Sequence, residues 1–208
     1  MENLTAEKSM QNEQFDPEEL LHLAVKASNA DDIDKAMDYL KRAISISPND
    51  AKAHYFLGAL HAEIGMFDRA IADMTKATEI DPDFLVAYFQ MGQVYITLND
   101  VDAAEEVWKA LDHLGEDNFY FLFKRGMLNV MRGNYEACIK DMKKGIELNN
   151  TNESLTNDMQ RLLVKAEDAL ALEKHSTGAT VTDISSAKDS QSGTHTLSAY
   201  QQSDNDDD

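Results

Sequence analysis

The chain has 208 residues, of which 43% are hydrophobic, and its 38 Asp and Glu against 19 Lys and Arg give a formal net charge of −19. This length suffices for one or two domains with a continuous core, whereas 3 Pro and 9 Gly are too few for a loop-rich all-β fold. An acidic surface repels phosphate backbones and anionic membranes, because these need Lys and Arg to neutralise them. We therefore expect neither a nucleic-acid nor a membrane partner, and we favour basic or apolar protein partners.

The N-terminal residues 1–15 are polar, and we predict that they are disordered. They lack a basic segment followed by an apolar run, so no secretory signal is expected. No stretch approaches the ~18 uninterrupted apolar residues of a membrane span. The single cysteine, Cys138, cannot form an intramolecular disulfide, so nothing indicates an oxidising compartment. These features predict a cytoplasmic protein.

From residue 17 onward, the chain repeats a pattern every 34 residues. Four blocks fit without a gap: 17–50, 51–84, 85–118 and 119–152. The eighth position is small in each block (Ala24, Gly58, Gly92, Gly126), and so is the twentieth (Ala36, Ala70, Ala104, Cys138). The seventeenth is apolar or aromatic (Ile33, Phe67, Val101, Tyr135), and the twenty-fourth is bulky (Leu40, Met74, Trp108, Met142).

This spacing predicts two amphipathic helices in every block, with apolar residues at i, i+3, i+4 and i+7. The small residues let paired helices approach closely, and the bulky ones fill the space between neighbouring pairs. Turn-prone dipeptides separate the two helices: Asp31-Asp32, Gly65-Met66, Asn99-Asp100 and Gly133-Asn134. The four blocks resemble the tetratricopeptide repeat, a 34-residue helix–turn–helix unit. The resemblance implies an all-α fold, a right-handed α-solenoid.

Two blocks depart from this repeat pattern. Blocks one and two carry Pro48 and Pro82 near their ends, whereas blocks three and four have Glu116 and Asn150 there. Block four also places Arg125 and Asn129 at its seventh and eleventh positions, which are usually apolar or aromatic. The first helix of this block either packs differently or carries a buried polar network.

After block four, residues 153–174 have apolar side chains at helical spacing. A solenoid exposes an apolar end face, so we predict that this segment is a capping helix that completes a tetratricopeptide domain over residues 16–174. The remaining residues, 175–208, form an acidic tail rich in Ser and Thr, with too little apolar content to offset the cost of ordering. We predict that this tail is disordered.

No catalytic motif is present: the sequence has no GxSxG, no glycine-rich phosphate loop and no HExxH. We expect no enzyme activity and no cofactor. His54 and His61 are seven residues apart, whereas helical metal pairs usually lie four apart, and Tyr88 and Tyr95 occupy the same positions in block three. Packing therefore explains the two histidines, and no metal site is predicted. Cys138 replaces a close-packed alanine, which favours a buried, inert thiol.

The resemblance implies that the first helix of each repeat lines a concave groove. It places a set of apolar, aromatic and amide side chains there, and these are the predicted partner-binding residues: Leu21, Lys52, Tyr55, Phe56, Phe89, Gln90, Gln93, Tyr120, Phe123, Lys124 and Met127. The five aromatic members would form an apolar strip in an acidic protein, which is typical of a binding surface. The alternative is that the groove curls tightly enough to bury them, or that the capping helix or the N-terminus folds over them.

Some tetratricopeptide domains bind a C-terminal carboxylate through a clamp of Lys, Asn and Arg, but here Lys124 alone matches that clamp. What remains is similar to bacterial tetratricopeptide adaptors, including the small acidic chaperones of type III secretion translocators. The predicted function is an adaptor or chaperone that binds a partner protein or extended peptide, apolar with basic flanks, in the concave groove. The alternative is a structural scaffold that self-assembles into a homo-oligomer.

Overall fold

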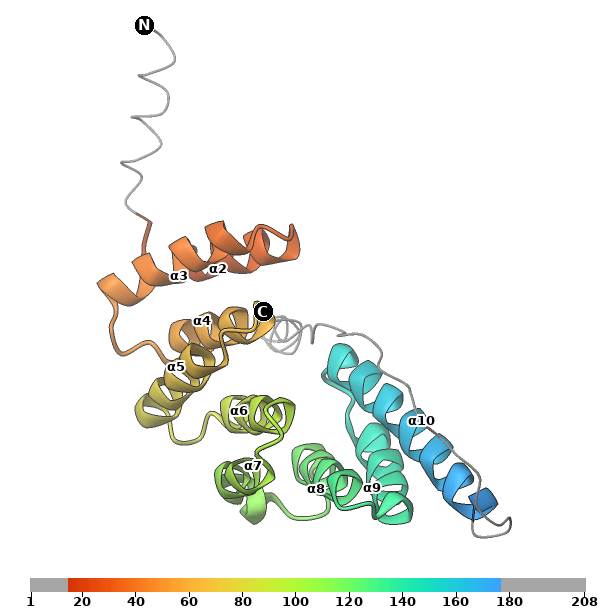
Figure 1. Cartoon of the computed structure of the whole chain (residues 1–208). Helices are drawn as coiled ribbons and strands as arrows, with labels where there is room; N and C mark the ends of the chain where they lie inside the picture. Colours follow the sequence, from red (N-terminus) through yellow and green to blue (C-terminus); the bar gives the residue numbers. More distant parts are fainter. Residues whose placement is uncertain (1–14, 177–208) are drawn as a thin grey trace, which may run out of the picture.

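The computed structural model describes residues 15–176 of the chain, and within them every regular element is a helix (Figure 1). Nine α-helices and one 3₁₀-helix follow one another in these residues: α2 (Pro17–Asn29), α3 (Ile33–Ile46), α4 (Ala51–Glu63), α5 (Phe67–Ile80), α6 (Leu85–Thr97), α7 (Val101–Trp108), η1 (Lys109–Leu114), α8 (Phe119–Met131), α9 (Tyr135–Leu148) and α10 (Glu153–Ser176). The all-α prediction is confirmed. Most of both predicted disordered segments lies outside the described residues, although α10 runs two residues into the predicted tail.

The first helix of each block, called helix A, begins at the first position of the 34-residue pattern, and the second, helix B, begins at the seventeenth. Acidic or amide residues before the helices help to fix these starts. Asp16 accepts a hydrogen bond from the backbone N–H of Glu19, whose side chain accepts one from the N–H of Asp16. This capping box satisfies two backbone donors that the first helical turn leaves unpaired. Pro17 follows at a position where its missing N–H costs nothing.

Every helix A ends in the same tight turn. The fifteenth residue of each block has a left-handed backbone: Asp31, Gly65, Asn99 and Gly133, with φ between 59° and 76°. The next residue then donates its N–H to a carbonyl five residues earlier, as between Met66 and His61 at 2.7 Å. This is a Schellman motif, which needs Gly, Asn or Asp at the left-handed position. The turn chemistry of the sequence therefore produces the reversal between helices A and B.

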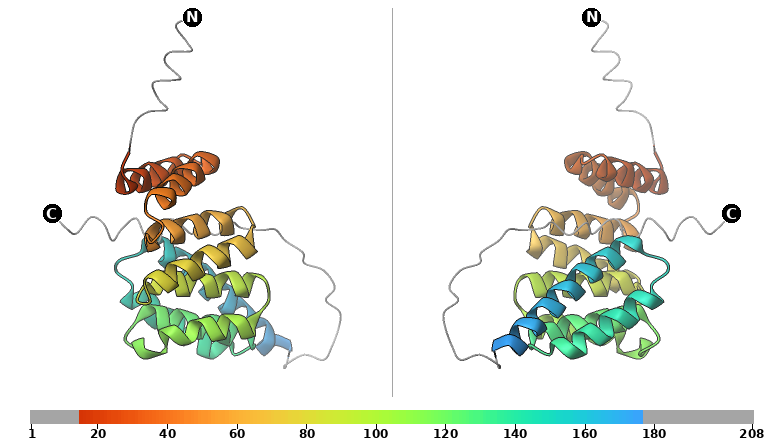
Figure 2. Two further views of the ribbon diagram at one scale, coloured as in Figure 1. Left: turned by 90° about the vertical axis from the view of Figure 1, so that its left-hand side faces the viewer. Right: turned by 90° about the vertical axis from the view of Figure 1, so that its right-hand side faces the viewer.

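The helix pairs stack into a curved array, in which α4 and α6 lie on the inner side of the curve and α5 and α7 on the outer side (Figure 1). The turns within pairs lie along one edge of the array, and the loops between pairs lie along the opposite edge (Figure 2). The small eighth residue allows close pairing, as predicted. A Cβ atom on Gly92 would lie 2.1 Å from Nε1 of Trp108, and one on Gly126 would lie 2.2 Å from Cε of Met142.

The apolar core is divided between two large clusters. One joins α2 to α6 through residues such as Leu40, Tyr55 and Met74. The other runs from α6 to α10 and includes Phe89 and Trp108. The indole N–H of Trp108 donates to the backbone oxygen of Phe89 at 3.0 Å, and the two rings stack with their centroids 6.1 Å apart. This pair anchors the second cluster to the third repeat.

The junction between the third and fourth repeats differs from the others. α7 ends after eight residues, and the 3₁₀-helix η1 supplies the six that complete the usual length of helix B. The Nζ atom of Lys124 donates to the backbone oxygen of Trp108 at 2.8 Å and also to Asp112. A cation that takes a backbone carbonyl in this way interrupts the α-helical hydrogen-bond ladder. We attribute the early end of α7 to Lys124.

Ion pairs reinforce this same junction. Four of them cross from block three to block four: Glu105–Arg132, Asp112–Lys124, Glu116–Arg125 and Asp117–Lys144. At the two earlier junctions of the described residues, apolar side chains of the first core cluster supply most of the packing. Charge therefore has a structural role at the junction where Glu116 replaces the expected proline.

The long helix α10 covers the last repeat. Leu155, Met159 and Ala166 are buried in the second core cluster, whereas Val164 and Leu172 on the other side of the helix are more than half exposed. This arrangement is the one expected of a capping helix. Among the described helices, none combines the length and the apolar character needed to cross a membrane.

Candidate functional site

The predicted partner-binding residues lie on helices α2, α4, α6 and α8, but their exposure differs. Six of them are buried: Tyr55, Phe56, Phe89, Gln90, Phe123 and Lys124. Four are half-buried: Leu21, Gln93, Tyr120 and Met127. Lys52 is exposed. The expectation of an exposed aromatic strip is therefore wrong for four of its five rings, which are buried.

The aromatic residue at the fifth position of a block is buried because it packs into the helix pair. In block three, Phe89 stacks on Trp108 of α7. In block four, Phe123 lies against α9, where a Cβ atom on Gly145 would come within 2.5 Å of its ring. In block two, the ring of Tyr55 meets that of Phe84 edge-on, with centroids 5.1 Å apart. In blocks two to four, the fifth position therefore belongs to the core, whereas Leu21 at the fifth position of block one is only half-buried.

One signal in the sequence could have revealed this packing. Gly145 lies in the interior of α9, where glycine disfavours a helix by roughly 1 kcal/mol relative to alanine. Such a cost is compensated when the missing side chain leaves space for a large neighbour, and Phe123 fills that space. Reading Gly145 as the partner of an aromatic ring would have placed Phe123 in the core.

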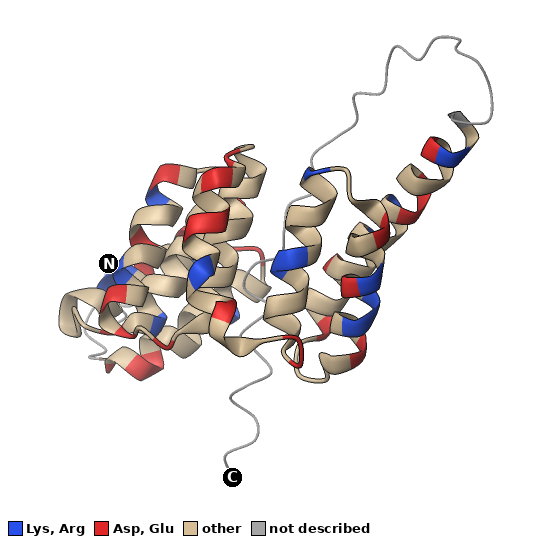
Figure 3. Cartoon of the chain, turned by 90° about the horizontal axis from the view of Figure 1, so that it is seen from below, with Lys and Arg blue, Asp and Glu red and all other residues tan. Residues whose placement is uncertain are grey.

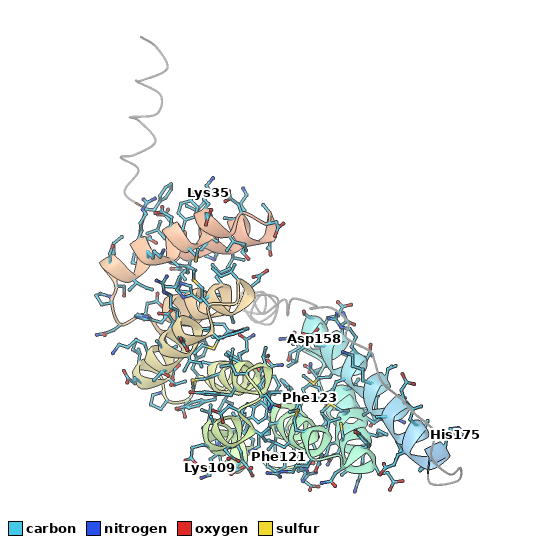
Figure 4. The ribbon with its side chains drawn as sticks, in the orientation of Figure 1. Lys35, Lys109, Phe121, Phe123, Asp158 and His175 are labelled. Carbon is cyan, nitrogen blue, oxygen red and sulfur yellow. The ribbon has the colours of Figure 1, made fainter. Side chains whose placement is uncertain are left out.

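Lys124 was expected in the groove, but its ammonium group is buried at the junction with the third repeat, against Trp108 and Asp112. The one residue of this chain that matches the carboxylate clamp is therefore bonded to the protein's own backbone. The ring of Phe121 lies 5.1 Å from both Nζ of Lys124 and Cζ of Arg125. Figure 4 shows Phe121 near the outer side of the array, with Phe123 on the opposite side of α8.

A cavity of about 250 Å³ lies at this junction, lined by residues of α7, η1 and α8. Four cations line it, and each is paired with a carboxylate: Lys109 with Glu106, Lys124 with Asp112, Arg125 with Glu116 and Asp141, and Arg132 with Glu105. An incoming anion would have to displace one of these carboxylates. The cavity is therefore part of the ionic junction, and we do not assign a ligand to it.

Half-buried apolar side chains remain at inner-face positions of the A helices. We call this set the inner-face surface: Leu21, Val25, Ile96, Tyr120, Met127 and Val130. Each packs against the core with one side and keeps part of its area accessible. Tyr120 packs against both core clusters. Within the second cluster, its ring centroid is 5.2 Å from that of Phe89 and 4.3 Å from that of Phe119. Burial raises the pKa of Tyr120 to about 12, so its phenol stays neutral.

The unusual polar residues of block four form a partly buried network between α8 and α9, centred on the buried Asp141. The guanidinium of Arg125 donates two parallel hydrogen bonds to the buried carboxylate of Asp141, from Nε to Oδ2 and from Nη2 to Oδ1, both at 2.8 Å. The amide of Asn129 donates to the same carboxylate at 3.4 Å. Bidentate, charge-assisted bonds of this kind are strong and orient both side chains. Of the two possibilities left open for this block, the polar network is the one observed.

Block two carries a related pair at the same two positions, because His61 and Asp73 correspond to Asn129 and Asp141. Nδ1 of His61 lies 2.6 Å from Oδ2 of Asp73, and the imidazole is buried. His54 uses Nε2 at 3.0 Å from the backbone oxygen of Pro48. Both histidines thus make local structural contacts. No group of three or more His, Cys, Asp or Glu side chains within residues 15–176 is arranged to hold a metal ion.

Cys138 is fully buried at the close-packed twentieth position. Burial, assisted by the nearby charge of Asp141, raises the pKa of its thiol to about 11. At neutral pH the sulfur is therefore protonated and a poor nucleophile, which agrees with the predicted inert thiol.

Comparison with known proteins gives three findings. A family profile described as "Tetratricopeptide repeat" matches residues 29–72 and 63–120. The chain is 24% identical over 126 residues to "Small glutamine-rich tetratricopeptide repeat-containing protein 2" of Saccharomyces cerevisiae, covering 61% of this chain and 34% of that protein. It is 30% identical over 79 residues to "Hsp70-Hsp90 organizing protein 2" of Arabidopsis thaliana, covering 38% of this chain and 14% of that protein.

A solved structure shares the helix arrangement. The "APC/C hetero-tetramer Cut9-Hcn1" aligns with a TM-score of 0.69 at 16% identity, covering 85% of this chain and 34% of that one. At this identity the likeness concerns the fold alone. The chain spans about a third or less of these relatives, and their whole-protein activities do not carry over to it directly.

Proposed function

Because the chain belongs to the tetratricopeptide repeat family, whose members are protein–protein interaction modules, we propose that it is an adaptor or chaperone. It holds a segment of a partner protein on its inner face. The single observation that carries the proposal is the inner-face surface. Its six apolar side chains stay partly accessible on three of the four A helices in a protein of net charge −19. Accessible apolar area of this kind is typical of a binding surface.

Met127 and Tyr120 suit such a role for different reasons. The unbranched thioether of Met127 adapts to partners of varied shape. Tyr120 offers a large ring with little rotational freedom to lose, and its hydroxyl gives it a polar end. Acidic positions are spread over the whole array (Figure 3). We therefore propose a partner segment with an apolar centre and basic flanks, which the acidic surroundings attract.

Burial decides which variants test this proposal. A charge at Phe89 or Phe123 would disrupt the core, so loss of binding there would say nothing about the surface. Val25→Asp/Met127→Asp instead places charges at two half-buried inner-face positions. The matched control is Val164→Asp/Leu172→Asp, which adds the same charge at exposed positions of α10. Helix content by circular dichroism checks that both variants fold.

The wild type and both variants are then used to capture partners from the native cell extract, and each captured protein is tested for direct binding by calorimetry. We expect one protein to bind the wild type and the control and to lose at least tenfold in affinity for the inner-face variant. If every captured protein binds the three forms equally, the inner face is not the binding site.

The second candidate, a self-assembling scaffold, makes a different prediction. Association through the C-terminal end would need an uncovered apolar face on the last repeat, but α10 covers that face with Leu155, Met159 and Ala166. Light scattering over a hundredfold range of concentration measures the molecular mass directly. A constant mass of one chain would exclude self-assembly, whereas a rising mass would favour it.

A further inference from the structure

The edge of the array that carries the turns between helices A and B is a second, independent surface. Exposed apolar side chains gather there in three successive blocks: Ile64, Met66, Leu98 and Met131, each between 37% and 45% exposed. They lie at or within two residues of the C-terminal cap of a helix A. These turns share one edge of the molecule (Figure 2). Apolar side chains in such turns contribute little to the core, so their presence needs another explanation.

A row of carboxylates runs beside this apolar row. Asp34, Asp68 and Asp102 occupy the eighteenth position of the first three blocks, all are exposed, and none forms an ion pair with another described residue. An acid in the first turn of a helix is favoured by the helix dipole, which accounts for each of them singly. Three cations are close in sequence to these residues: Lys35 lies over the ring of Tyr39, Arg69 donates to the sulfur of Met66, and Arg132 is paired with Glu105. The edge is therefore apolar along its centre and negative at its side.

From these two rows we propose that the turn edge docks a basic amphipathic α-helix of a partner protein. We call Ile64, Met66, Leu98 and Met131, together with the three aspartates, the turn-edge surface. The partner helix places its apolar stripe on the first row and its Lys or Arg side chains on the second. This interaction is separate from the one proposed for the inner face and does not depend on it.

The two parallel rows select a helix over an extended segment. An α-helix can carry an apolar stripe and a basic stripe side by side along its length, because residues seven apart return to the same face. An extended strand alternates its side chains between opposite faces, so the residues that face the turn edge form a single file. A helix with adjacent apolar and basic stripes therefore fits both rows.

The test uses a fluorescent 21-residue peptide of Leu, Ala and Lys with Leu at positions i and i+4 of each heptad and Lys on the adjacent face. Its control is an isomer of the same composition in which the leucines are scattered over all faces. Binding to the full chain is measured by fluorescence anisotropy. The turn-edge variant is Ile64→Ser/Leu98→Ser, and its matched control is Ile46→Ser/Leu172→Ser, at exposed apolar positions outside this edge.

We expect the patterned peptide to bind the wild type and the control at least tenfold more tightly than the isomer does, and to lose that preference in the turn-edge variant. Asp68→Asn/Asp102→Asn should weaken binding several-fold and reduce its dependence on salt. Equal binding of both peptides would overturn the proposal, because it would mean that charge alone drives association. Full binding by the turn-edge variant, with loss in Val25→Asp/Met127→Asp, would overturn it by moving the peptide to the inner face.

Discussion

Substituting alanine for glycine at the eighth position of a block should change the free energy of unfolding by different amounts in different blocks, because the added methyl group meets different neighbours. Gly92→Ala brings a Cβ atom to 2.1 Å from Nε1 and 2.2 Å from Cε2 of Trp108. The indole cannot move aside without breaking its hydrogen bond to Phe89 and the stacked contact between the rings. Gly126→Ala meets only Cε of Met142, the end of a flexible side chain that can rotate away.

The expected magnitudes follow from opposing contributions. Each substitution gains roughly 1 kcal/mol of helix propensity. For Gly92→Ala, overpacking costs about 1–3 kcal/mol, and the lost indole hydrogen bond costs about 1 kcal/mol more. The net change is a loss of about 1–3 kcal/mol in the free energy of unfolding. For Gly126→Ala, a small repacking cost leaves the protein between unchanged and about 1 kcal/mol more stable.

Urea unfolding followed by circular dichroism and by fluorescence measures both changes. Since Trp108 is the only tryptophan of the chain, its emission reports directly on the clash. We expect Gly92→Ala to shift the emission to longer wavelength and to lower the unfolding midpoint. Gly126→Ala should leave the emission unchanged and the unfolding midpoint unchanged or higher. If Gly92→Ala proves as stable as Gly126→Ala, with unchanged emission, the close packing inferred for Trp108 is wrong.

Two further predictions concern buried polar groups. Arg125→Gln should lower the free energy of unfolding in urea by about 3 kcal/mol, because it leaves the buried Asp141 carboxylate without its cation. Arg132→Gln breaks an exposed pair and should lower the free energy of unfolding by less than about 1 kcal/mol. Equal losses in the two variants would contradict a special role for the network around Asp141. The Cys138 thiol should react with a thiol reagent at pH 8 only in urea, and fast labelling of the native protein would contradict its burial. Its pKa is raised from 9.0 to about 11 in the folded state, so this group should lower the free energy of unfolding as pH rises through that interval, as unfolding titrations can test.

The 34-residue period predicted the fold in detail, because helix starts, turns and small-to-bulky packing all follow from local sequence. The turn at Gly65 and the fit of Gly92 against Trp108 are both readable from residue type and position. The candidate site was less predictable. Register along a helix assigned Phe89 and Phe123 to the inner face, but the direction of a large ring depends on the space left by residues far along the chain.

Lys124 shows the same limit for a charged group. Its position in the repeat suggested a groove residue, whereas the structure gives it a partner on the preceding block. Nothing local to Lys124 encodes that choice. It follows from the early end of α7 and from the carbonyl of Trp108, which the period alone treats as ordinary helix.

The ionic junction also constrains how this protein could have gained or lost repeats. Between the first and second blocks the core packing is apolar, so an additional 34-residue block could be copied there while its neighbours keep the same kind of core surface. The junction between the third and fourth blocks is different. Lys124 of the fourth block bonds to the backbone oxygen of Trp108 and to Asp112 of the third block, where α7 ends. A different block placed between them would bury the ammonium group of Lys124 and the carbonyl of Trp108 against surfaces that lack these partners. Duplication of this half of the array must therefore copy both blocks as one unit.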